Sequence, residues 1–467
     1  MLRSGLLIAF AVVLLCSSTV QADTSAIADY IRTRAYCELS TSNTIGSIEA
    51  NDIDKASGLI PSIYAGLVVW ADGRSGRIAI MGYDLTDPNN IVAPSKGEFL
   101  ISNETDGWQE NNPFAGYSSV GGYRYVVYDA VDVSSPTGDL GNIQGSRATP
   151  APTWLVQNPL RQQTPVLTNV TSSQTVLAWI HQPGTVSDLD DYPNTDIYAG
   201  TLTSPVTSPV PGMTNLTAGM AAPRDHLAAD GRRLAWQELR YDESADVKSW
   251  DLVVYDLGGT YADPNLRFRY VNGTDSTKNQ ITPDLSGNLL AWAQEEDPSG
   301  TGATNIYFQD LASSVGPMAV TTTGTAANPA ISTFQALTSD GNEVMTLIDV
   351  AFLVWQDHRG DGNTMSFFAG GNGETDYNWD IWAQELRITV GEWALYKDAF
   401  LIPADTLGRQ TNPDIYGLDV CWQSQDPGVE DIYVWGPLAV PEPGTILFLA
   451  AGAVLLCRGR RKSGKGK

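Results

Sequence analysis

The sequence has few histidines and few basic residues. It contains 3 histidines among 467 residues, and 28 lysines and arginines stand against 53 aspartates and glutamates, which gives a formal net charge of −25. A surface of that sign repels the phosphate backbone of nucleic acids and the headgroups of anionic lipids. The composition therefore argues against a nucleic-acid partner and favours solubility or cation binding.

Familiar catalytic motifs are absent too. The chain has no Gly-x-Ser-x-Gly elbow, no His-Glu-x-x-His helix, no phosphate-cradling glycine loop and no cysteine-pair zinc pattern. His181, His226 and His358 lie far apart in the sequence, and we interpret each as structural. Paired carboxylates for glycoside hydrolysis cannot be selected from so many acids without geometry. We thus predict no catalytic residues and no required cofactor.

Acidic loops are the one candidate feature for a ligand. Asp188, Asp190, Asp191 and Asp196 lie close together in the sequence, and a second group contains Asp357, Asp361 and Asn363. Calcium takes about six to eight hard oxygen ligands, which such loops can help to supply. Neither loop has EF-hand spacing. Two interpretations stay open, a calcium site at Asp188, Asp190, Asp191 and Asp196, or solvated turn residues.

Long hydrophobic runs are confined to the two ends of the chain. Arg3, the apolar segment Leu6–Leu15 and a small-residue site ending at Ala22 predict a signal peptide over residues 1–22. At the other end an apolar run, Ile446–Cys457, precedes a basic terminus. Twelve residues of helix span roughly 18 Å, well short of a bilayer core of about 30 Å. We expect transient membrane contact there rather than a permanent span; the alternative is a buried C-terminal helix.

The C-terminal order of Pro441-Glu442-Pro443, a short apolar run and an arginine cluster resembles the PEP-CTERM sorting signal of bacterial exported proteins. That resemblance implies an exosortase as processing partner, transient retention at the inner membrane, and a final location in the cell envelope or outside the cell. It also implies an association with exopolysaccharide and biofilm matrix. Removing Arg3, the six basic residues of 458–467 and Glu442 leaves 21 basic and 52 acidic residues, a net charge of −31.

Cysteine is equally scarce. Of four cysteines, Cys16 and Cys457 lie in the terminal apolar segments, so only Cys37 and Cys421 belong to the body of the chain. In an oxidising compartment they can form a disulfide that closes a very long loop. Two separate thiols are the alternative.

A short strand ending in an aromatic residue recurs along the body. Successive aromatic positions lie 58, 51, 57, 56, 63 and 67 residues apart, at Trp70, Tyr128, Trp179, Trp236, Trp292, Trp355 and Trp422. A second element, an Asp or Asn followed by an aliphatic residue and often an aromatic one, comes after most of them, as in Asp196-Ile197-Tyr198. Three copies carry a proline nine residues before the tryptophan, at Pro61, Pro283 and Pro413. These shared offsets identify an internal repeat.

Units of this length, rich in β-branched and aromatic residues and separated by turn residues, predict four-stranded blades of an all-β propeller. The pattern resembles TolB-type propeller repeats. We predict seven blades over residues 61–438, with six as the alternative because the second copy has Tyr128 in place of tryptophan. Residues 23–60 are expected to complete the ring, and residues 439–467 to be the sorting signal.

Aromatic residues outside the repeat register are candidates for stacking on sugar rings. They are Trp108, Trp154 and Trp393, with burial in the core as the alternative for each. We expect an exported binding or structural module whose partner is an exopolysaccharide or a surface protein. The alternative is an extracellular glycan hydrolase or lyase, which a catalytic cluster at the centre of the ring would favour.

Overall fold

The computed structural model describes strand Cys37–Glu38 and most of the body of the chain. The described residues of the body are 60–73, 78–86, 98–102, 108–120, 122–132, 141–147, 152–158, 160–183, 193–203, 210–242, 247–258, 267–271, 278–296, 303–339, 345–359, 379–389, 391–402, 409–426 and 429–435. The predicted signal peptide and the sorting motif Pro441-Glu442-Pro443 lie outside them. No helix among the described residues is long and apolar enough to cross a membrane.

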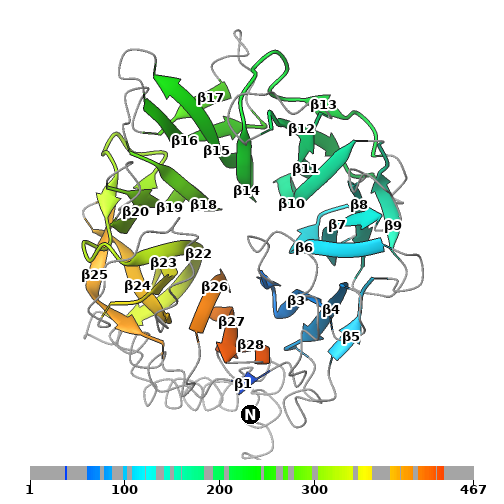
Figure 1. Ribbon diagram of the computed structural model, residues 1–467. Helices are drawn as coiled ribbons and strands as arrows, with labels where there is room; N and C mark the ends of the chain where they lie inside the picture. Colours follow the sequence, from blue (N-terminus) through cyan, green and yellow to red (C-terminus); the bar gives the residue numbers. More distant parts are fainter. Residues whose placement is uncertain are drawn as a thin grey trace, which may run out of the picture.

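Seven four-stranded antiparallel sheets are arranged around one axis (Figure 1). Blade 1 contains β2 (Ser62–Tyr64), β3 (Leu67–Asp72), β4 (Ala79–Asp84) and β5 (Glu98–Leu100). Blade 2 contains β6 (Trp108–Ser118), β7 (Tyr123–Asp132), β8 (Gly141–Ser146) and β9 (Thr153–Val156). Blade 3 contains β10 (Arg161–Thr171), β11 (Gln174–Gln182), β12 (Asp196–Thr201) and β13 (Thr214–Asn215). In each of these blades the first strand is innermost.

The next three blades repeat this order from the axis outward (Figure 1). Blade 4 contains β14 (Arg224–Asp230), β15 (Arg233–Asp242), β16 (Val247–Asp256) and β17 (Phe268–Tyr270). Blade 5 contains β18 (Gln280–Ser286), β19 (Leu289–Glu295), β20 (Thr304–Asp310) and β21 (Met318–Ala319). Blade 6 contains β22 (Ala326–Ser339), β23 (Met345–Asp357), β24 (Asp380–Thr389) and β25 (Glu392–Leu401).

Blade 7 combines the two ends of the body. Its inner strands are β26 (Arg409–Tyr416), β27 (Asp419–Asp426) and β28 (Val429–Trp435), and its outermost strand is β1 (Cys37–Glu38). In β1, Cys37 pairs with Val434 and Glu38 with Tyr433. The predicted all-β fold with seven blades is therefore confirmed. The second copy is a full blade, in which the buried hydroxyl of Tyr128 donates to Gln144 Oε1 at 3.0 Å.

The repeated aromatic residues form the core, as the spacing predicted. All six tryptophans of the repeat are at most 1% exposed. They lie on the second strand of each blade, which is covered on both faces by the neighbouring blades. One apolar cluster, for example, joins Val68 and Trp70 of blade 1 to Cys421 and Ile432 of blade 7. The hydrophobic core thus consists of layers between blades, and each blade depends on its neighbours to bury its faces.

The innermost strands of blades 2 to 7 carry a β-bulge at the same place. The pairing register shifts there in every one of these blades, between Ile281 and Asp284 in blade 5, for instance. At each bulge one non-glycine residue has φ between 46° and 52°: Asn112, Thr164, His226, Thr282, Asn328 and Asn412. Asparagine tolerates this left-handed conformation, whereas a β-branched threonine is strained in it. A proline follows every one of these residues except His226.

We predict that Thr282→Asn stabilises the protein by about 1 kcal/mol, because it replaces a strained β-branched residue by one that tolerates φ near 49°. The Thr282 hydroxyl makes no hydrogen bond within the described structure, so little is lost. The measurement is the free energy of unfolding from denaturant titration. Thr164→Asn, at the same bulge position of blade 3 with φ of 50°, is the matched variant and should also stabilise. Loss of stability in Thr282→Asn would contradict the assignment of strain to this position.

Candidate functional site

Hydrogen bonds from one blade to the next line the innermost strands. Each of these strands is the edge of its sheet, so its outward backbone N–H groups need acceptors from outside the blade. Ser62 Oγ accepts from Ala115 N at 3.2 Å, Asp284 Oδ2 from Ile331 N at 2.7 Å, and Asp414 Oδ2 from Ile63 N at 2.8 Å. Ser62, Asp284 and Asp414 occupy the same repeat position, directly after the proline that lies nine residues before the core tryptophan. One position therefore links blade 1 to 2, blade 5 to 6, and blade 7 to 1.

A second set of contacts uses the residue after the core tryptophan. Gln237 Oε1 accepts from Thr282 N at 2.9 Å, and Gln356 Oε1 accepts from Asn412 N at 2.9 Å. The donors are left-handed bulge residues of the following blade. Asn328 Nδ2 adds a bond to Asn412 Oδ1 at 3.0 Å. The bulges thus point backbone donors at side-chain acceptors of the preceding blade, which explains why they recur around the ring.

At the hairpin end of the innermost strands, the contacts between neighbouring blades are of two kinds, hydrogen bonds and aromatic packing. Between blades 3 and 7 they join a polar side chain to backbone of the next blade: Thr168 to Gly231, Asp230 to Gly287, Ser286 to Thr333 and Ser332 to Gly417. In blades 7 and 1 the corresponding residues are Tyr416 and Tyr64, whereas in blade 2 the corresponding residue is Gly116 and Tyr117 follows it. We call Tyr416, Tyr64 and Tyr117 the tyrosine cluster.

The tyrosine cluster is a continuous aromatic surface that is open to solvent. The ring centroids of Tyr64 and Tyr416 lie 4.4 Å apart, and those of Tyr64 and Tyr117 lie 6.5 Å apart with nearly parallel planes. Tyr64, in the middle, is half-buried, while Tyr117 and Tyr416 are 36% and 38% exposed. Burial, followed by interaction with Tyr416, raises the pKa of Tyr64, so its hydroxyl stays protonated and able to donate. Flat aromatic faces flanked by hydroxyl groups suit stacking on a ligand ring.

Asp284 and Asp414, on the innermost strands, accept hydrogen bonds that connect neighbouring blades. Burial, with the charge of Asp414 second, raises the pKa of Asp284 to about 8. Burial raises the pKa of Asp414 to about 6. Both carboxylates accept backbone N–H groups of the next blade. They are structural acceptors, and their geometry does not suggest an acid–base pair aimed at a substrate.

One enclosed pair of acids, on β15 and β16, is also structural. Glu238 and Asp251 are directly opposite each other on β15 and β16, and their side chains are 8% and 2% exposed. Arg224 donates from Nε to Glu238 Oε2 at 2.8 Å, and Arg240 lies 3.7 Å from Asp251. Burial raises the pKa of Asp251 to about 7. Because protein covers both carboxylates, a glycan could not reach them in this conformation.

The predicted calcium residues are only partly within the described chain. Asp188, Asp190 and Asp191 lie outside it. Asp196 begins β12, where its Oδ1 accepts from Thr217 Oγ1 at 3.1 Å and lies 3.9 Å from the guanidinium of Arg224. No group of three or more metal-ligating side chains occurs among the described residues. Asp357, in the second acidic loop, instead accepts from the indole of Trp355 and from the backbone of Arg359.

The predicted Cys37–Cys421 disulfide is not borne out. Cys421 is a free, buried cysteine. Strand β28 lies between β1 and β27, and its Val434 pairs with Cys37 on one side and with Cys421 on the other. Two strand spacings amount to roughly 9.6 Å, more than the 7 Å or so that a disulfide allows between Cα atoms. Ring closure brings the two segments into one sheet, but one strand too far apart.

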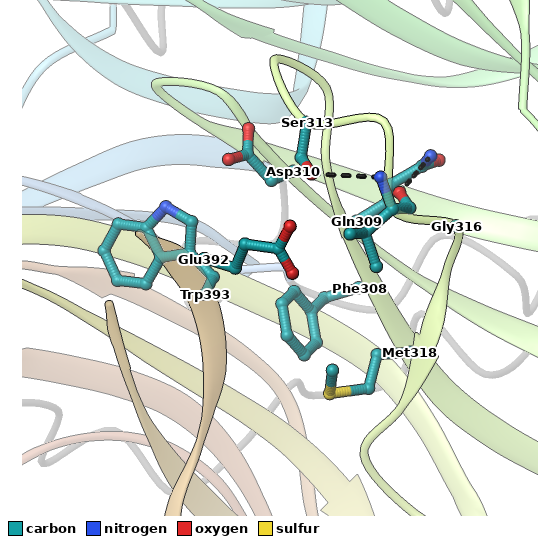
Figure 2. A pocket seen from close by; sticks show the side chains of 9 residues that line it. Phe308, Gln309, Asp310, Ser313, Gly316, Met318, Glu392 and Trp393 are labelled. Carbon is teal, nitrogen blue, oxygen red and sulfur yellow. Dashed lines mark hydrogen bonds between the residues drawn. The ribbon is translucent and has the colours of Figure 1, made fainter. Parts of the chain in front are cut away.

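The tryptophans outside the repeat register have two different environments. Trp108 and Trp154 pack edge to face with ring centroids 4.9 Å apart in blade 2, and both are half-buried. Trp393 lines a shallow pocket between blades 5 and 6 (Figure 2). The sequence did not reveal the tyrosine cluster, because its members sit within the repeat, where aromatic residues are expected to be core. His181 and His358 are buried, as expected for structural residues.

We predict that Asp284→Asn stabilises the protein at pH 8 and has little effect at pH 4. The amide oxygen keeps the bond from Ile331, while the carboxyl has a pKa of about 8 when folded against 3.8 as its ordinary value. The unfolded chain therefore ionises first, and stability falls as pH rises from about 4 to 8. Because Asp284 is half-buried, water reduces the effect, and we expect roughly 2 kcal/mol at pH 8.

Thermal or denaturant unfolding across this pH range checks the prediction. Asp414→Asn is the matched variant, and its effect should be confined to a narrower window, about pH 4 to 6. A stability difference for Asp284→Asn that does not change with pH would contradict the assignment.

The solved structures that are similar to this chain include β-propellers. The β-propeller domain of the trilobed protease from Pyrococcus furiosus has 9% identity and a TM-score of 0.43, over 80% of this chain and 94% of that one. Putative TolB from Agrobacterium tumefaciens has 12% identity and a TM-score of 0.32, over 69% and 88%. A mutant of Trypanosoma rangeli sialidase displaying trans-sialidase activity has 11% identity and a TM-score of 0.40, over 70% and 53%, so this chain spans about half of it.

These similarities concern fold alone, and at such TM-scores no functional argument rests on them. The sequence matches no protein-family model and no curated protein.

Proposed function

We propose that this protein is an exported propeller that binds a polysaccharide through the tyrosine cluster. The observation that carries the proposal is the row of Tyr416, Tyr64 and Tyr117. Tyr416 and Tyr64 occupy the repeat position at which blades 3 to 6 have small hydrogen-bonding residues, and Tyr117 lies one residue beyond that position in blade 2. Pyranose rings present apolar C–H faces that stack on aromatic rings, and neighbouring hydroxyl groups fix the orientation. The acids beside this surface already accept backbone N–H groups, which supports binding rather than glycan hydrolysis.

Charge narrows the class of ligand. With a net charge of −25 the chain repels acidic polysaccharides, most strongly at low ionic strength. The proposed ligand is therefore a neutral or amino-sugar polysaccharide.

We predict that Tyr117→Ala combined with Tyr416→Ala weakens glycan binding by about tenfold or more, roughly 1.4 kcal/mol. The measurement is a glycan array followed by calorimetry on the best neutral ligand, with product analysis by mass spectrometry. Tyr241→Ala is the control, since Tyr241 is 54% exposed on blade 4, away from the cluster. Equal binding by the double variant and the control would contradict the site, and release of shortened glycans would contradict a non-enzymatic role.

The sorting proposal rests on the sequence of the terminus. We expect that replacing Pro441, Glu442 and Pro443 by alanine in a host with an exosortase leaves the protein in the membrane fraction. Fractionation with detection of a tag after residue 22 measures this, and Pro437→Ala just upstream is the matched control. Identical distribution of the two variants would contradict recognition of the Pro-Glu-Pro motif.

A further inference from the structure

Among the described strands, the outermost strand of blade 6 differs from those of the other blades in length. Its outermost strand β25 is 10 residues long, whereas the outermost strands of the other blades have 2 to 4 residues (Figure 1). It pairs only with β24 and ends its sheet, so its second edge carries backbone groups that no other strand of the described chain pairs. Short outer strands protect a propeller from unwanted strand addition, and β25 departs from that protection.

The surface beside this edge is apolar. Ile388 is 44% exposed and Leu395 is 39% exposed, on the adjoining strands of blade 6. Across from them Val315, in the β20–β21 connection of blade 5, is 40% exposed. Ile388 pairs directly with Trp393, so the apolar side chains share the face of blade 6 that looks toward blade 5. Neighbouring exposed apolar residues next to a free strand edge are typical of strand-addition sites.

The shallow pocket at the start of β25 has a distinct chemistry. Its walls include Phe308, Met318 and Trp393. The Glu392 side chain lies between Trp393 and Phe308, and Asp310 lies near Ser313 at the upper rim (Figure 2). Gln309 also lines it, but its amide group is directed away from Trp393 and Glu392 and donates from Nε2 to Val315 O at 3.3 Å (Figure 2). No lysine or arginine is among the lining residues.

These groups are complementary to a cation. The two carboxylates accept hydrogen bonds, and an indole face attracts ammonium and guanidinium groups. Phe308 and Met318 provide apolar contact for the methylene stem of a long basic side chain. An extended chain that carries a lysine or arginine suits both features: its backbone can pair with the edge of β25, and its basic side chain can enter the pocket.

We propose that β25 accepts an additional strand from a basic partner protein, with one lysine or arginine side chain of that strand in the pocket formed by Phe308, Gln309, Asp310, Met318, Glu392 and Trp393. Main-chain hydrogen bonds along β25 supply affinity, and the acidic pocket supplies selectivity for the basic side chain. This site is in blades 5 and 6 and does not involve the tyrosine cluster, so it stands independently of glycan binding.

The test uses fluorescence anisotropy of the full chain with three labelled nine-residue peptides of alternating threonine and valine. One peptide carries a central lysine, one a central glutamate, and one the lysine with prolines flanking it, which removes backbone donors. We expect the lysine peptide to bind at least tenfold more tightly than either of the others. Equal binding of the lysine and glutamate peptides would overturn the role of the pocket, and equal binding of the proline peptide would overturn strand addition.

Two variants localise the binding. Glu392→Gln removes one surface charge with little risk to folding, and Trp393→Ala removes the indole; each should weaken the lysine peptide at least fivefold. Asp256→Asn removes the same charge from blade 4 and is the control for general attraction to an acidic chain. If Asp256→Asn weakens binding as much as Glu392→Gln, the attraction is unspecific and the proposal is wrong. Thermal melting confirms that each variant is folded.

Discussion

The innermost strand of every blade is an open sheet edge, and its backbone N–H groups must find acceptors in the preceding blade. Side-chain oxygens at a few repeat positions meet this requirement, as Asp284 and Asp414 do for Ile331 and Ile63. The left-handed bulges follow from it, because they turn the N–H groups of Thr282 and Asn412 toward Gln237 and Gln356. The raised pKa values of these carboxyl groups do not disturb the ring, because a carboxyl oxygen can accept a hydrogen bond whether or not the group is ionised.

The same constraint explains where a ligand surface is found. At the hairpin ends of most innermost strands, neighbouring blades are joined by hydrogen bonds of small polar side chains, which expose no large side chain to a ligand. Where blade 7 meets blade 1, and where blade 1 meets blade 2, tyrosine rings pack against one another. Aromatic stacking holds that part of the ring and at the same time leaves two rings exposed. Structure and proposed binding therefore use the same side chains, and substitutions there should be judged by folding as well as by affinity.

Much of the fold could be predicted from sequence because the core tryptophans keep nearly constant spacing. Only some of the prolines at the bulges could be recognised from their spacing in the sequence. Pro283 and Pro413 lie nine residues before their tryptophans, but longer first hairpins put Pro165 and Pro329 at other offsets, so no single spacing reveals all of them. The pairing of Cys37 with Cys421 failed for a related reason: sequence shows that the ends meet, but not the order of strands within the last sheet. The tyrosine cluster could not be predicted, since exposure depends on neighbours in three different blades.

The central claim is that the tyrosine cluster is the surface that meets the ligand. Hydrogen–deuterium exchange of the full chain, with and without a saturating neutral polysaccharide, tests it most directly. The account predicts added protection confined to the hairpin ends that contain Tyr64, Tyr117 and Tyr416, with the opposite ends of the innermost strands, near Asn328 and Asn412, unchanged. Protection at those opposite ends without any at the tyrosines would contradict it.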